Sequence, residues 1–142
     1  MNHEANKNLI RRYVATWNSG DLEALSQFWA PEMRHHTRSR SHDFEGVRKI
    51  VTDFGEAFPD LHFELEDIVA EGDRVVTRMR ATGTHTSDYM GVPASGRSID
   101  CQVMGIARIE NGKMAEHWGV TDELAIMQQI GLVPDAYLAA MA

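Results

Sequence analysis

The spacing of the apolar residues changes near Pro59, and this change limits the folds open to the chain. Before it, apolar side chains recur at the spacing of amphipathic helices over residues 3–18 and 44–58, with a shorter helix between them that Asp21 can begin. After it, apolar and polar residues alternate, as they do in half-buried strands, over residues 61–70, 74–85 and 98–109. Helices followed by a strand meander predict an α+β fold. We expect one long, curved antiparallel sheet wrapped over three helices, forming a cone with a pocket at its mouth.

The strand predicted over 98–109 has one face of apolar or small residues, which we expect to be buried: Ile99, Cys101, Val103, Gly105, Ala107 and Ile109. Asn111-Gly112 is a strong hairpin signal, and it leads into a further strand and a short helix over 123–129. The chain has 142 residues and no internal repeat, so we predict a single domain over residues 1–142.

Composition and charge limit the kinds of molecule that the protein is expected to bind and the compartment in which we expect it. A formal net charge of −7 argues against nucleic acid or an anionic membrane as the main partner. No apolar run approaches the roughly 18 residues that a membrane span needs. The N-terminal stretch MNHEANKNLIRR lacks the apolar segment of a signal peptide. The single cysteine, Cys101, has no partner for an internal disulfide, so we expect a cytoplasmic protein.

Two residues near the end of the last predicted strand are candidate site residues. Trp118 and Asp122 are four residues apart and would share one face of an extended chain. A carboxylate that loses hydration beside an indole becomes a stronger base, so Asp122 could act as a general base in a pocket. Asp122 could equally cap the helix over 123–129, and the two roles do not exclude each other.

Several stretches of the sequence resemble the SnoaL-like polyketide cyclases of the nuclear-transport-factor-2-like (NTF2-like) superfamily. They are FPDLHFELEDIVAEGDRVVTRMRATGTH, GVPASGR and ENGKMAEHWGVTDELAIMQQIGLVP, together with the helical opening RRYVATWNSGDLEAL. The resemblance covers nearly the whole chain. It implies an NTF2-like cone, with a curved antiparallel sheet wrapped on three N-terminal helices around an internal pocket, usually as a homodimer. It also implies ring closure by intramolecular aldol condensation without a metal or organic cofactor. The acid/base Asp of the family falls on Asp122.

Some positions depart from the family pattern. His36 stands where related sequences commonly have a histidine, but His35 occupies a position that is often acidic. Gly105 stands where an Asp is common on the long strand, and Gly119 stands where a larger polar residue often follows Trp118. These changes remove polar groups from the expected wall of the pocket.

Two histidines complete the predicted catalytic set. A neutral imidazole can donate a hydrogen bond to a developing enolate oxygen, which is the role expected for His36 and His85. Each could instead be a structural histidine bonded to a backbone carbonyl. Strand parity turns His117 away from Trp118, so we expect His117 outside the site.

Apolar residues at helical or strand spacing are expected to line the pocket and bind substrate, although each could also be plain core: Tyr13, Trp17, Phe54, Phe58, Met79, Met90, Cys101 and Trp118. We expect no metal site, because the seven histidines form no HExxH pattern and no Cys/His cluster with ligand spacing.

The leading functional hypothesis is a cofactor-independent cyclase that uses general acid/base chemistry, of the intramolecular aldol type, on a hydrophobic, polyketide-like carbonyl compound. Isomerisation and dehydration on the same scaffold are alternatives. Epoxide hydrolysis is another, but it needs an inward-facing Asp-Arg-Asp cluster, whereas Arg78 and Arg80 should face outward.

A non-catalytic small-molecule-binding protein or a dimeric interaction module is a hypothesis from another class, favoured by the missing polar group at Gly105. An enclosed pocket with Asp122 at its base would favour the enzyme, and a filled cone would favour the module. The outer face of the sheet, which presents Val76, Met104 and Ile106, is apolar enough to predict a homodimer.

Overall fold

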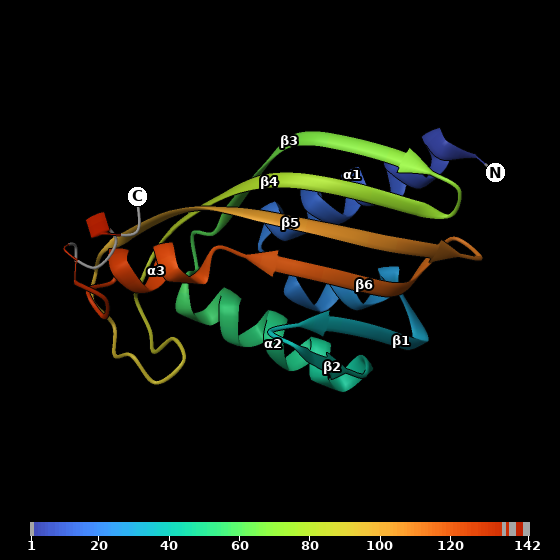
Figure 1. Cartoon of the computed structure of the whole chain (residues 1–142). Helices are drawn as coiled ribbons and strands as arrows, with labels where there is room; N and C mark the ends of the chain where they lie inside the picture. Colours follow the sequence, from blue (N-terminus) through green and yellow to red (C-terminus); the bar gives the residue numbers. More distant parts are fainter. Residues whose placement is uncertain (1, 135, 137–138, 141–142) are drawn as a thin grey trace.

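The computed structural model describes residues 2–134, 136 and 139–140, and it confirms the α+β architecture (Figure 1). The helical segments are α1 (His3–Ser19), the 3-10 helix η1 (Leu22–Phe28), α2 (Phe44–Ala57) and the short α3 (Glu123–Gln129). The strands are β1 (Trp29–Thr37), β2 (Arg40–His42), β3 (His62–Glu71), β4 (Arg74–Thr84), β5 (Ser98–Glu110) and β6 (Lys113–Thr121). Within the described residues, no helix is long and apolar enough to cross a membrane.

An Asn or Asp precedes each helical segment, and its side chain accepts a backbone N–H from the first turn. Asn2 does this for α1, Asp21 for η1, Asp43 for α2 and Asp122 for α3. These bonds satisfy donors that have no partner inside the helix, which is why the segments begin at these residues.

The six strands form one sheet in the order β2-β1-β6-β5-β4-β3. Neighbouring strands are antiparallel except for β1 and β6, which are parallel, so the sheet is mixed rather than wholly antiparallel as predicted. The sequence did not predict the direction of β1 relative to β6, because β1 precedes the β3–β6 meander and no hairpin links the two strands. Figure 1 shows α1 and α2 together on one face of this curved sheet.

The face of the sheet that carries the helices forms the core. Its alternate residues are almost wholly buried, including Val75 on β4 and Ile99 and Ala107 on β5. The predicted buried face of β5 is therefore confirmed. The helices cover it with the apolar stripes that the sequence periodicity indicated: Leu9, Ile10 and Val14 from α1, and Val47 and Val51 from α2.

A shift of register at Ala115 decides which side chains of β6 face the helices. Ile109 pairs with Met114 beside the hairpin turn, whereas Arg108 pairs with Glu116, so β6 has one residue more than β5 at this point. A one-residue shift moves every later side chain to the opposite face. Beyond the shift the odd-numbered residues of β6 face the helices. Trp118 faces outward, and the prediction that it lines the pocket is wrong.

Candidate active site

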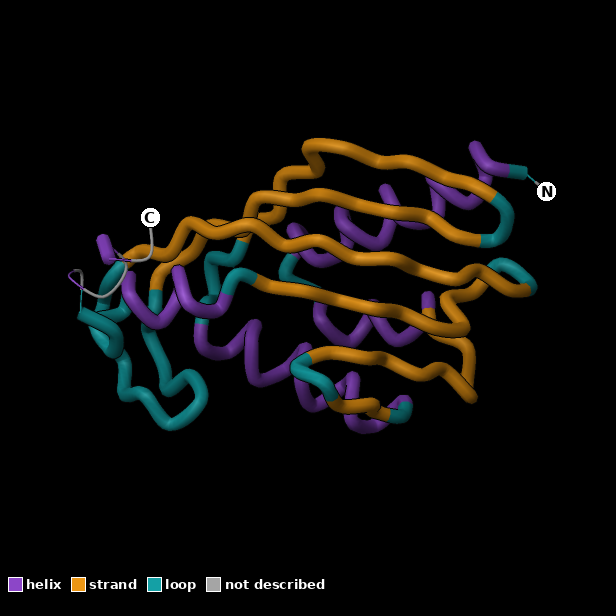
Figure 2. Tube along the Cα trace, viewed as in Figure 1, coloured by secondary structure: helices purple, strands orange, loops and turns teal. Residues whose placement is uncertain are grey.

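A cavity of about 870 Å³ opens between the helices and the concave face of the sheet. Its size is within the range usual for small-ligand sites. Exposed residues of the loop between β4 and β5, such as Ser87 and Asp88, line its mouth. Figure 2 shows this loop at the same end of the sheet as α3. The cone is therefore open rather than filled.

The predicted substrate-binding residues divide into two groups. The structure places Tyr13, Trp17, Phe54, Met79 and Met90 on the cavity wall. Trp29, Met33, Phe63, Tyr89 and Met114 extend this apolar and aromatic surface.

The other predicted binding residues do not line the cavity. Phe58 is wholly buried in the core, where its ring packs against Phe54 and Tyr89. Cys101 is buried on β5, and burial raises the pKa of its thiol to about 11, so the thiol stays protonated at neutral pH. Trp118 lies on the outer face, for the reason given above.

Asp122 also lies outside the cavity. Its side chain is exposed and accepts the Ala125 backbone N–H at 3.1 Å, as the N-cap of α3. It borders a small groove of about 200 Å³ beside Arg80 and Asp100. The helix-cap role predicted for Asp122 is confirmed, whereas its position in the pocket is corrected by the β6 register.

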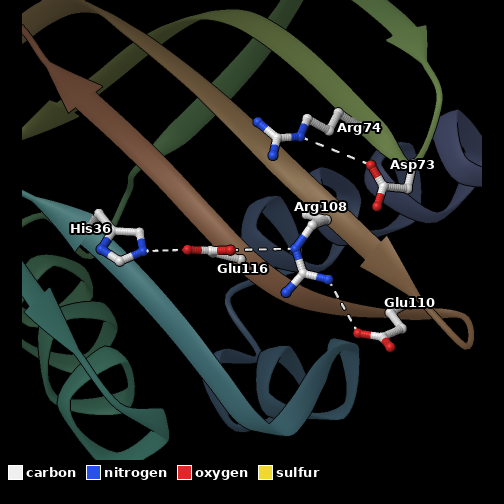
Figure 3. A network of polar contacts seen from close by, with 6 residues as sticks. All are labelled: His36, Asp73, Arg74, Arg108, Glu110 and Glu116. Carbon is white, nitrogen blue, oxygen red and sulfur yellow. Dashed lines mark hydrogen bonds and ion pairs between the residues drawn. The ribbon is translucent and has the colours of Figure 1, made fainter.

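His36 belongs to a polar network on the outer face of the sheet (Figure 3). Its Nε2 lies 2.7 Å from Glu116 Oε2, and Arg108 donates to the other oxygen of Glu116 at 3.3 Å. The bond from His36, with that from Arg108, holds the pKa of Glu116 below its ordinary value. The His36 ring also lies 5.4 Å from the ring of Trp118, centre to centre. These contacts stabilise the outer surface, and they keep His36 away from the cavity.

His85 is a buried structural histidine. Its Nδ1 accepts the Ser95 backbone N–H at 3.1 Å and lies 2.8 Å from Ser95 Oγ. Because Nδ1 is an acceptor, the proton is on Nε2, which has no hydrogen-bond partner in the described part of the chain. The ring packs on Phe58, away from the cavity, and connects the β4–β5 loop to the core.

Two histidines that were not in the predicted catalytic set, His35 and His117, meet on the cavity wall. His35 on β1 and His117 on β6 are register partners, and both line the cavity. Their Nδ1 atoms are 2.9 Å apart, and the planes of the rings differ by 17°. One Nδ1–H must donate to the other Nδ1, because two lone pairs would repel. The pair therefore presents one Nε2 that accepts a hydrogen bond and one that donates.

Both imidazoles are neutral at pH 7. Burial is the main cause that lowers the pKa of His35 to about 4, with smaller effects of His42, His36 and Arg38. Burial also lowers the pKa of His117 to about 3, and His35 adds to the effect. A neutral pair can accept a proton at one Nε2 while it donates a hydrogen bond from the other.

Two glycines make room for these rings. Gly105 and Gly119 are register partners on β5 and β6. A Cβ at Gly105 would lie 2.8 Å from His117 Nε2, and one at Gly119 would lie 3.3 Å from the Cε1 atoms of both histidines. His35, Gly105 and Gly119, the three departures from the family pattern, thus belong to one arrangement. Their joint occurrence was the signal in the sequence that could have identified the pair.

Within the described residues, no group of three or more His, Cys, Asp or Glu side chains is arranged to hold a metal ion.

Several known proteins are similar to this chain in sequence and in fold. The model of the SnoaL-like polyketide cyclase family matches residues 7–130. The aklanonic acid methyl ester cyclase DnrD of Streptomyces peucetius is 27% identical over 130 residues, which span 87% of this chain and 88% of that protein. The structure of AclR from Streptomyces galilaeus, for which hydroxylase activity has been suggested, has a TM-score of 0.88 and 31% identity over 94% of this chain and 100% of its own. The structure of TsrD from Streptomyces laurentii has a TM-score of 0.83 and 32% identity over 94% of this chain and 99% of its own.

Proposed function

The chain belongs to the SnoaL-like polyketide cyclase family, and from this membership we propose that it closes a ring in a polyketide-like carbonyl compound by intramolecular aldol addition, with His35 and His117 as the acid/base pair. One observation carries the proposal: two neutral, hydrogen-bonded imidazoles line a large apolar cavity. Proton transfer by positioned side chains is the catalysis that this chemistry needs.

The proposed reaction has two proton transfers. The imidazole with the free Nε2 lone pair removes a proton from the carbon next to a carbonyl, while the Nε2–H of its partner donates a hydrogen bond to the developing enolate oxygen. The enolate carbon then attacks a second carbonyl of the same molecule, forming the new carbon–carbon bond. The resulting alkoxide takes the proton back from the imidazolium. Atoms and electrons balance within the substrate, so no external oxidant or reductant is consumed.

Negative charge that develops in the reacting complex raises the pKa of the histidine that acts as the base. Burial disfavours an isolated imidazolium, but proton removal from the substrate creates an enolate beside it. An opposite charge at short range favours the charged form of the base. The neutral partner histidine also accepts a hydrogen bond from the protonated ring at Nδ1. The pair thus stabilises charge when the transition state develops it.

The walls of the cavity support a hydrophobic substrate with several fused rings. Aromatic side chains surround the space, including Trp17, Trp29 and Phe54. A cavity of about 870 Å³ exceeds what a single ring would fill, and flat aromatic walls favour flat ligands.

We also propose a homodimer formed through the convex face of the sheet. Val76, Met104 and Val120 are 38%, 49% and 72% exposed there. Val76 pairs with Ile106, and Met104 pairs with Val120, so these side chains form adjacent rows on one surface. Contiguous apolar surface of this kind is typical of an interface.

A cytoplasmic location is proposed on the single, buried cysteine, which leaves no internal disulfide to maintain.

The test is to incubate the purified protein with aklanonic acid methyl ester, the compound for which the relative DnrD is named. Liquid chromatography with mass spectrometry should detect a new product of unchanged mass, because an aldol closure only rearranges the substrate. A product heavier by one oxygen would indicate hydroxylation and contradict the proposal. Tight binding without any product would support the non-catalytic alternative.

A further inference from the structure

Arg38 lies at the mouth of the cavity and connects three segments of the chain. It follows β1 in the turn to β2, and it lines the cavity together with Thr37 and Glu123. Its Nε donates to Glu123 Oε1 at 2.5 Å, and its Nη2 lies 3.5 Å from the Tyr89 hydroxyl. Glu123 belongs to the first turn of α3, and Tyr89 belongs to the β4–β5 loop. The remaining guanidinium N–H groups have no partner within the described residues, so donors are left for a ligand.

The backbone at Arg38 is unusual for its residue type. Its φ is 50°, and that of Ser39 is 59°, in the left-handed region where Gly and Asn are favoured. A residue with a long side chain in this conformation is strained, and such strain is concentrated at functional sites. The turn thus holds an arginine where a smaller residue would fit the backbone better.

The charge of the guanidinium is already balanced. Glu123 is its ion-pair partner, and Asp88 and Glu56 also line the cavity. A ligand carboxylate bound at Arg38 would therefore be repelled by Glu123 and would compete with it for the guanidinium. An uncharged oxygen would accept a hydrogen bond from Arg38 without this repulsion.

We propose that Arg38 is a specificity-determining residue that binds an uncharged carbonyl, ester or phenol oxygen of the substrate, and that its ion pair with Glu123 selects against a carboxylate at the same place. This inference rests on the proposed function in that it takes the cavity to be the substrate site. His35 lies on β1, three residues before Arg38. An oxygen held at the mouth leaves the apolar body of the ligand to extend along the wall towards His35 and His117.

Binding of model compounds tests the proposal without turnover. Trp17 and Trp29 line the cavity, so a ligand that enters it changes the tryptophan fluorescence. The probes are anthracene, which has no oxygen, 9,10-anthraquinone, which has two carbonyl oxygens, and anthraquinone-2-carboxylate, which adds a charge.

The matched variants are Arg38→Asn and Ser39→Asn. Both place asparagine, which tolerates positive φ, in the same turn, so neither variant adds backbone strain. Only Arg38 lines the cavity. We expect Arg38→Asn to lower the ratio of anthraquinone affinity to anthracene affinity about tenfold, as loss of one charge-assisted hydrogen bond would. Ser39→Asn should leave the ratio unchanged. An unchanged ratio in Arg38→Asn, or no binding of anthraquinone to the wild type, would overturn the proposal.

Glu123→Gln tests the selection against charge. It removes the balancing carboxylate and keeps an oxygen that Arg38 can still reach. The affinity for anthraquinone-2-carboxylate should rise about tenfold relative to anthraquinone, and no change would refute this part of the inference.

Failure of the proposed function has a different signature. Variants of His35 and His117 that keep full turnover would refute the acid/base pair. The ratio of anthraquinone affinity to anthracene affinity would still test the role of Arg38.

Discussion

His35 and His117 lie opposite each other on the parallel strands β1 and β6, with their Nδ1 atoms 2.9 Å apart. The contact depends on the one parallel pairing in the sheet and on the register shift at Ala115, which turns His117 towards the helices. It also depends on glycine at positions 105 and 119, where a Cβ would crowd the rings. A pair that requires all of these features of the fold is a specific arrangement, and it can be tested by changing each feature in turn.

Stability should fall as the pH is lowered from about 6.5 towards 4. An unfolded histidine has a pKa near 6.5, whereas folding lowers the pKa of His35 to about 4 and of His117 to about 3. Between these values the unfolded chain binds more protons than the folded chain. The free energy of unfolding is therefore highest above pH 6.5 and decreases as the pH falls, by at most about 1.4 kcal/mol per pH unit for each histidine. Urea unfolding at several pH values measures this decrease in the free energy of unfolding. In His117→Phe the pH dependence should be shallower, and curves parallel to those of the wild type would contradict the assignment.

Gly105→Ala should impair activity more than Gly119→Ala. The added methyl group at 105 would lie 2.8 Å from His117 Nε2, so the ring must move and its bond to His35 must lengthen. Displacement of a catalytic group by about 1 Å can cost on the order of 10²-fold in rate. At Gly119 the closest approach is 3.3 Å, which a shift of a few tenths of an ångström relieves. Steady-state kinetics measures the activity of the two variants, and their melting temperatures serve as the control for folding. Equal effects would argue against the packing described here.

Asp122→Asn should keep turnover close to that of the wild type. The asparagine side chain still accepts the Ala125 N–H and caps α3, and Asp122 does not line the cavity. Asp122→Ala should cost about 1 kcal/mol of unfolding free energy through loss of the cap. A loss of 10²-fold or more in the Asn variant, with an unchanged melting temperature, would return the catalytic role to Asp122.

Sedimentation should detect a dimer at micromolar concentration, and Val120→Glu should convert it to a monomer. Val120 is 72% exposed on the convex face and pairs with Met104. A charge placed among these apolar side chains is costly to bury in an interface, whereas it is solvated in a monomer. A wild-type monomer would refute the proposed assembly.

Most elements of the fold were predictable because their signals are local, but β2 (Arg40–His42) was not predicted. The apolar periodicity over residues 3–18 and 44–58 matches α1 (His3–Ser19) and α2 (Phe44–Ala57) to within a residue at each end. The alternation in β5 identified the buried face correctly, since that strand has one helix-covered face along its length.

The site was less predictable because it depends on pairing between distant segments. The direction in which Trp118 and His117 point is set by the register shift at Ala115, which strand parity alone does not include. Arg38 and Glu123 are 85 residues apart, and no local pattern predicts their contact. Family resemblance directed attention to Asp122 by motif, whereas only the structure shows that the glycines at 105 and 119 leave space for the histidine rings.

The most direct test of the central claim is the turnover of His35→Asn, His117→Asn and the double variant on the substrate that the wild type cyclises. We expect each single variant to lose about 10²- to 10⁴-fold in kcat while it still binds anthraquinone. The double variant should lose little more, because two residues that act as one unit are not additive. His36→Asn, the neighbouring histidine on the outer face, is the matched control and should retain activity. Folded single variants that turn over at the wild-type rate would contradict the role of the pair.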